Sequence, residues 1–84
     1  MRPYQVYINQ EALLSAPRSG PQRKAVMDFI RTLAANPHSI GDFAETDGVG
    51  RTVYVKILGR FAITFWADHP VSEVKITHIQ PADK

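Results

Sequence analysis

The N-terminal segment alternates apolar and polar positions. Tyr4, Val6 and Ile8 alternate with polar or amphipathic residues, which is the period of a half-buried strand. Asn9 follows and offers a side-chain oxygen to cap a short helix over Glu11–Ala16. Pro17 ends this helix because proline lacks a backbone N–H. The start of the chain therefore predicts a strand and then a short helix.

A longer helix is predicted next, with signals at both ends. Ser19 is placed as its N-cap, and Gln22 is placed to complete a capping box. Apolar side chains then recur at helical spacing on one face: Val26, Phe29, Ile30 and Leu33. Asn36-Pro37 ends the helix, because proline disfavours helical backbone in the residue before it. The apolar stripe predicts that this helix packs on a core.

Strand-like patterns fill the rest of the chain. Asp42–Thr46 is a short, weak strand, and Asp47-Gly48 is a strong hairpin signal before the alternating segment Arg51–Leu58. Two more strands follow around Phe61–Phe65 and Val74–Ile76. A chain of this length can bury only one modest core, so residues 1–84 are expected to form a single α+β domain. The expected order of elements is one strand, two helices and four strands. The two helices are expected on one face of a mostly antiparallel four- to five-stranded sheet, the N-terminal strand pairing at an edge or between later strands.

The alternation also predicts which strand residues the helices cover. The expected covered set is Val53, Val55, Ile57, Phe61, Ile63, Phe65, Val74 and Ile76. The expected solvent set is Tyr54, Lys56, Arg60, Ala62, Thr64, Trp66, Lys75 and Thr77. Cations and aromatic rings mixed on one face suit the phosphates and unstacked bases of single-stranded RNA. Ordinary solvent exposure of one sheet face explains the same pattern equally well.

Composition narrows the functional classes. Ten Lys and Arg against eight Asp and Glu give a net charge of only +2, too small to imply nucleic-acid binding by itself. No cysteine is present, and no two histidines or carboxylates have the spacing of a helical metal pair, so neither a metal nor another cofactor is expected. Without a secretion signal or a run of roughly 20 apolar residues, a cytoplasmic protein away from membranes is expected.

One catalytic hypothesis remains, which is metal-free cleavage of RNA. A base would deprotonate a ribose 2′-hydroxyl, cations would stabilise the charged transition state, and an acid would protonate the leaving oxygen. Lys56, Arg60 and His78 are the predicted catalytic residues. His78 shares its parity with Val74 and Ile76, however, which favours a hydrogen-bonded histidine at the rim of the core unless the strand bulges before it.

The order of these motifs resembles the RelE/ParE superfamily of toxins from bacterial toxin–antitoxin pairs. The similar segments are Tyr4–Ile8, Ala12–Leu14, Ile30–Pro37 with Gly41, Arg51–Lys56, Gly59–Phe65 and Val74–Ile79, nearly the whole chain. The resemblance implies a cognate antitoxin partner and, in one branch, ribosome-dependent cleavage of messenger RNA. Lys56 matches a basic position of that branch, whereas Ala62 stands where an arginine is usual, and His78 or Lys84 would supply the C-terminal group.

Three functions follow from the resemblance. Translation inhibition by messenger RNA cleavage comes first, with Arg51, Tyr54, Trp66 and Lys75 as predicted RNA-binding residues and the ribosome and messenger RNA as partners. Inhibition of DNA gyrase comes second, because that branch lacks the nuclease residues and has an arginine like Arg51. A protein-interaction module that keeps the fold without the activity comes third.

Overall fold

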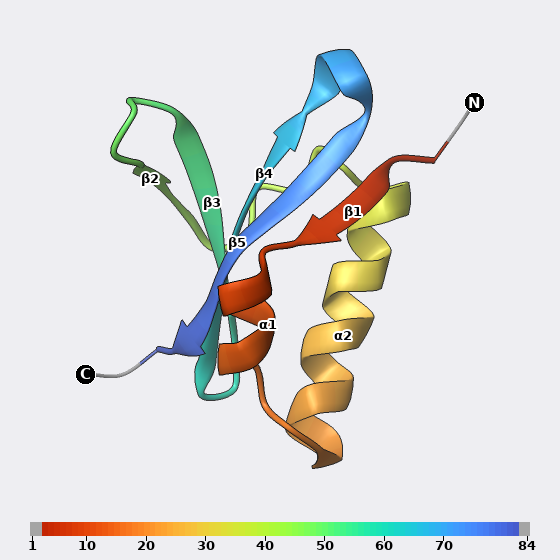
Figure 1. Ribbon diagram of the computed structural model, residues 1–84, viewed down its shortest axis with the longest axis vertical. Coiled ribbons are helices and arrows are strands. Elements are labelled where there is room, and N and C mark those ends of the chain that lie inside the picture. Colours follow the sequence, from red (N-terminus) through yellow and green to blue (C-terminus); the bar gives the residue numbers. More distant parts are fainter. Residues whose placement is uncertain (1–2, 83–84) are drawn as a thin grey trace.

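The computed structural model of the chain describes residues 3–82, which form two helices and one five-stranded sheet (Figure 1). The elements in chain order are β1 Gln5–Ile8, α1 Gln10–Ser15, α2 Gly20–Ala35, β2 Phe43–Thr46, β3 Thr52–Leu58, β4 Phe61–Asp68, a short 3₁₀ turn His69–Val71 and β5 Glu73–Pro81. The strands lie in the order β1-β5-β4-β3-β2, and only the β1–β5 pair is parallel. The predicted α+β fold is confirmed, with the N-terminal strand at an edge.

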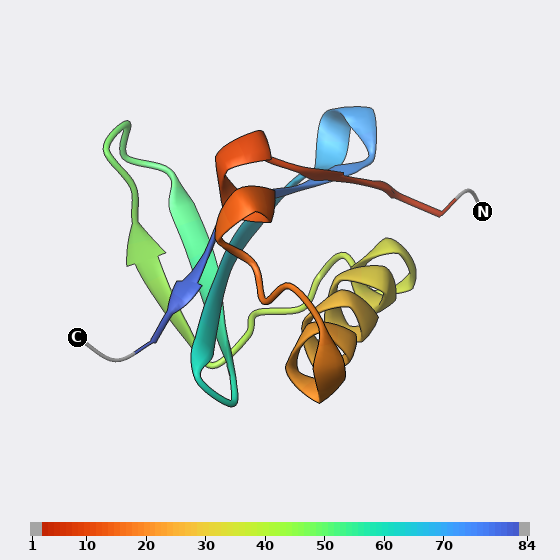
Figure 2. The ribbon, with the colours of Figure 1, turned by 60° about the horizontal axis from the view of Figure 1, so that its bottom comes forward.

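The core lies between the helices and one face of the sheet. Val26, Ile30 and Leu33 of α2 are buried as their spacing predicts, and they pack with Ala12 and Ala16 from the α1 region. The sheet contributes Ile63, Phe65, Val74, Ile76 and Ile79. In Figure 2 the β2–β3 hairpin curves away from α2, which leaves the other face of the sheet uncovered within residues 3–82. In the same range neither helix is long and apolar enough to cross a membrane.

The helix caps follow the sequence in one case and differ in the other. The Asn9 side chain accepts hydrogen bonds from the backbone N–H groups of Glu11 and Ala12, as predicted. Ser19 is the N-cap residue of α2, but its side chain makes no capping bond, so the predicted capping box is wrong. Gln22 instead donates to the Leu58 carbonyl and accepts from the Arg60 N–H. A long-range bond to the β3–β4 turn replaces the local one.

The predicted division of β3 between the two faces is wrong. Leu58 pairs with Phe61 across a two-residue turn, and Tyr54 pairs with Phe65, so these partners share a face. Tyr54 and Lys56 therefore lie on the helix side, whereas Val53, Val55 and Ile57 lie on the uncovered side. Val53 and Val55 are nevertheless buried, and they line the hollows of the uncovered face. The prediction failed because the more apolar face of β3, with Val53, Val55 and Ile57, is the one that the helices do not cover.

A β-bulge decides where His78 points. The β4–β5 register shifts between Thr64 and Phe65: Phe65 pairs with Ile76, while Thr64 pairs with His78. Thr77 is the extra residue, so His78 is exposed on the uncovered face and Ile79 takes the buried position. The expectation that His78 lies at the rim of the core is therefore wrong. The strand bulges before His78, which is the exception that the sequence allowed.

Gly41 gives a direct test of the packing before β2. Its φ is +63°, and an added Cβ would lie 2.6 Å from the Val55 carbonyl oxygen. Gly50 also has a positive φ, but an added Cβ there meets nothing within 4 Å. We expect Gly50→Ala to cost about 1–2 kcal/mol of unfolding free energy from backbone strain alone. Gly41→Ala should cost clearly more, measured by urea denaturation, and equal losses would contradict the close approach of Gly41 to β3.

Candidate functional site

The uncovered face of the sheet is hollowed into a groove. We call it the open face, formed by Phe43, Glu45, Val53, Val55, Ile57, Ala62, Thr64, Trp66, Lys75, His78 and Gln80. Two adjoining hollows of about 430 and 310 Å³ share Glu45, Thr64 and Gln80, so the groove is continuous along the face. Its floor is apolar along β3, while Arg51 and His78 line one of the two hollows. The groove thus offers a cation and an imidazole beside an apolar surface.

Arg51 is held in place by its own turn. The Asp47 carboxylate accepts hydrogen bonds from the backbone N–H groups of Val49 and Arg51 and from Nε of Arg51, the last at 2.9 Å. The guanidinium carbon lies 4.0 Å from the centre of the Trp66 ring, and Nζ of Lys75 lies 5.6 Å from it. These contacts bring three of the predicted RNA-binding residues together. In the sequence, Asp47 indicated only a hairpin. The role of the Asp47 carboxylate in orienting Arg51 was missed.

His78 stands on the open face beside the Thr77 hydroxyl. Its Nδ1 lies 3.1 Å from Oγ1 of Thr77, and the Thr77 hydroxyl donates to the Thr64 carbonyl. The imidazole is exposed and lines the same hollow as Arg51. An imidazole is the side chain used most often in general acid–base catalysis.

The remaining predicted site residues lie elsewhere. Lys56 is on the helix side, and its Nζ lies 3.5 Å from a carboxylate oxygen of Asp42. Tyr54 packs against the core, with its ring centre 6.1 Å from that of Phe65. Arg60 is exposed in the β3–β4 turn, at the far end of β3 from Arg51. The structure therefore does not bring Lys56, Arg60 and His78 together, and Lys84 lies outside the described residues.

The hydrogen bonds around Asp47 make the stability of this turn depend on pH. The Arg51 backbone N–H, followed by the Val49 N–H and the Arg51 side chain, lowers the pKa of Asp47 below its ordinary value of 3.8. A lowered pKa in the folded state contributes stability above the unfolded value, and that contribution is lost as pH falls through the folded value. Between neutral pH and about pH 5, Asp47→Asn should therefore have a lower urea midpoint than the unchanged protein. The gap to the unchanged protein should close below about pH 4, and a gap independent of pH would contradict this role.

Within residues 3–82 no group of three or more His, Cys, Asp or Glu side chains could hold a metal ion. The side chains that the described site brings together are one imidazole, two cations and an indole ring.

Known structures share this fold along their whole length. The chain superposes on a chain of the archaeal RelE–RelB complex from Pyrococcus horikoshii with a TM-score of 0.76 and 14% identity, covering 96% of this chain and 97% of that one. It superposes on a chain of the RelBE2 toxin–antitoxin complex from Mycobacterium tuberculosis with a TM-score of 0.73 and 21% identity, covering 99% and 97%. No protein-family model and no curated protein sequence matches. The chain therefore has the RelE-like toxin fold.

Proposed function

We propose that the chain is the toxin of a toxin–antitoxin pair, kept inactive by a cognate antitoxin. The observation that carries this proposal is the superposition over nearly the full length of both chains on structures described as toxin–antitoxin complexes. Several large apolar side chains are exposed, among them Leu14, Ile40 and Phe43. Exposed apolar side chains are typical of a surface that a partner protein covers.

The activity that we propose is inhibition of translation by ribosome-dependent cleavage of messenger RNA. Arg51 and Lys75 would contact phosphates, and Trp66 would support an unstacked base. His78 would take the proton of the attacking 2′-hydroxyl. Since the groove holds one imidazole within residues 3–82, the leaving oxygen would receive its proton from water or from a ribosomal group. The roles predicted for Lys56 and Arg60 stay predictions.

Induced expression tests the proposal. We expect the chain to arrest growth of a bacterial host and a co-expressed antitoxin, encoded beside it, to restore growth and to co-purify with it. The comparison variant is Arg51→Ala, which deletes the groove cation and whose fold and expression level are confirmed by circular dichroism and immunoblot. Normal growth at full expression of soluble, unaltered chain would contradict the proposal.

Inhibition of DNA gyrase is the second candidate, and a specific observation favours it. The floor of the groove along β3 is apolar, formed by Val53, Val55 and Ile57 with Phe43 beside them. Apolar floors suit a protein partner better than a phosphate backbone. Under this candidate, DNA synthesis would fail before protein synthesis, and the His78 imidazole would be dispensable.

A further inference from the structure

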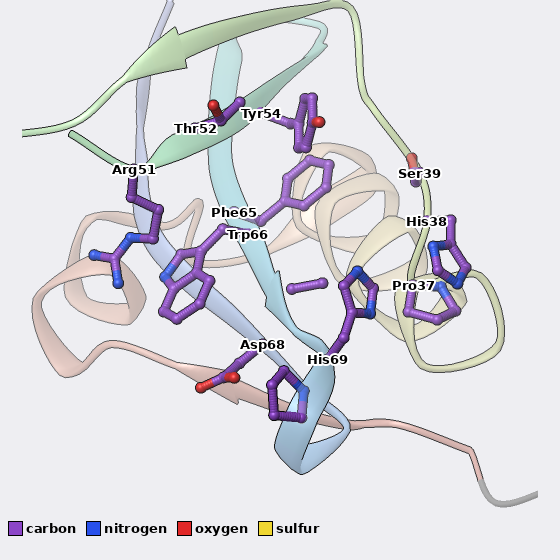
Figure 3. A pocket seen from close by; sticks show the side chains of 12 residues that line it. Pro37, His38, Ser39, Arg51, Thr52, Tyr54, Phe65, Trp66, Asp68 and His69 are labelled. Carbon is purple, nitrogen blue, oxygen red and sulfur yellow. The ribbon is translucent and has the colours of Figure 1, made fainter.

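A separate cleft lies at the end of the sheet, beyond the point where β3 and β4 pair. Their ladder runs only from Tyr54–Phe65 to Leu58–Phe61, so the first residues of β3 and the last residues of β4 diverge. The loop after α2 closes the other side of the space, which measures about 450 Å³. Figure 3 shows Arg51 and Trp66 on one side of this cleft and His38 and His69 on the other. Its size is within the range of small-molecule sites.

One wall is a stacked pair of imidazole rings. The ring centres of His38 and His69 lie 4.7 Å apart with only 16° between the planes. The Tyr4 hydroxyl lies 2.8 Å from Nδ1 of His69, and the two rings also meet edge to face. Three segments distant in sequence thereby hold a flat aromatic surface at the cleft: the residue before β1, the loop after α2 and the β4–β5 turn. A planar ring can stack on such a surface at little ordering cost.

The opposite wall carries an oriented cation. Nε of Arg51 is bonded to Asp47, while the guanidinium lies 4.0 Å from the Trp66 ring centre. The two terminal amino groups of Arg51 have no hydrogen-bond partner among residues 3–82. A guanidinium held in this way can bind a phosphate through two parallel hydrogen bonds. Asp68 also lines the cleft and can accept a hydrogen bond from a ribose hydroxyl or a base amino group.

We propose that this cleft binds one nucleotide of a single-stranded RNA. The base lies between the Trp66 indole and the His38–His69 pair, and the phosphate lies on Arg51. Arg51 lines both the cleft and the groove, so a strand can continue from one to the other past this side chain. The choice of RNA as the source of the nucleotide rests on the proposed function, whereas the site itself rests on the geometry of the cleft.

The fluorescence of Trp66 reports on this site directly, because the chain contains a single tryptophan. The full-length chain is titrated separately with AMP, adenosine and inorganic phosphate, with free tryptophan as the correction for light absorbed by the nucleotide. We expect saturable quenching by AMP and affinities at least about tenfold weaker for adenosine and phosphate, since each keeps only one of the two contacts. His38→Ala and Arg51→Ala should each weaken AMP binding by about tenfold or more. Arg31→Ala, on the exposed surface of α2, should leave it unchanged.

The outcomes separate this inference from the proposed function. AMP binding that depends on His38 and Arg51 supports the cleft, even if the chain does not arrest growth. Absence of saturable quenching overturns it, even if growth arrest is complete. Equal affinity for AMP and inorganic phosphate, or binding that survives His38→Ala, also overturns it, because either result shows an anion site without a base pocket.

Discussion

Replacing Phe65 by alanine is expected to lower the free energy of unfolding by about 3–5 kcal/mol. The ring is only 2% exposed and packs edge to face on Phe29 of α2, with ring centres 5.6 Å apart. At roughly 0.05–0.15 kcal/mol per residue, a domain of this size has a total stability of the same order. The variant should therefore be largely unfolded at moderate urea, as measured by the decrease in circular dichroism.

Ile57→Ala provides the matched control for this prediction. Ile57 is also an apolar strand residue, but it lies on the open face and is 37% exposed. Its truncation should cost no more than about 1 kcal/mol, because little buried surface is lost. If the two variants were equally destabilised, or if Ile57→Ala were the more costly, the assignment of the helix-covered face would be wrong.

Replacing His78 by alanine is expected to lower the rate of messenger RNA cleavage on purified ribosomes by at least about a hundredfold. The fold should be preserved, because the side chain is exposed and its loss should change stability by no more than about 0.5 kcal/mol. The bulge at Thr77 is what presents this imidazole in the groove.

Lys56→Ala is the comparison that separates two accounts of the catalytic residues. Lys56 pairs with Asp42 on the helix side, so an active site on the open face predicts cleavage within a few-fold of the unchanged protein. Loss of cleavage in Lys56→Ala with retention in His78→Ala would instead place the reaction on the helix side of the sheet. Circular dichroism of both variants excludes misfolding as the cause.

The helices and the order of elements were predictable because their signals are local. Asn9 caps a helix through neighbouring N–H groups, and the stripe Val26, Ile30 and Leu33 needs only helical spacing. The hairpin at Asp47-Gly48 is likewise local. Interactions between residues within about four positions of one another can be predicted from the sequence alone. The structure confirms each of these elements.

The faces of the sheet were harder to predict because they depend on pairing between strands. A two-residue turn makes Leu58 pair with Phe61, which places residues of equal parity on β3 and β4 on opposite faces. Since the more apolar face of β3 is the one that the helices leave uncovered, hydrophobicity alone could not reveal this. The bulge that reverses His78 also depends on the β4–β5 register and has no composition signal of its own.

The candidate site was likewise predictable only in part. Trp66 and Lys75 lie on the open face as predicted, whereas Tyr54 and Lys56 were placed there only by the mistaken register. His78 reaches the same face through the bulge, against the expectation from its parity, and Arg51 lines the groove beside it. The stacking of His38 on His69 was missed, since this contact joins loops that are far apart in sequence. Residues that act together across loops become visible only in the folded chain.

Incorporation of radiolabel into protein and into DNA during the first minutes after induction tests the central claim most directly. The proposed translation inhibitor should stop protein labelling at once while DNA labelling continues, and the His78→Ala variant should leave both unchanged. Early failure of DNA labelling with protein synthesis intact would contradict the claim and support gyrase inhibition. Undisturbed labelling of both, with soluble chain confirmed, would contradict a toxin of either kind and leave a protein-interaction module with this fold.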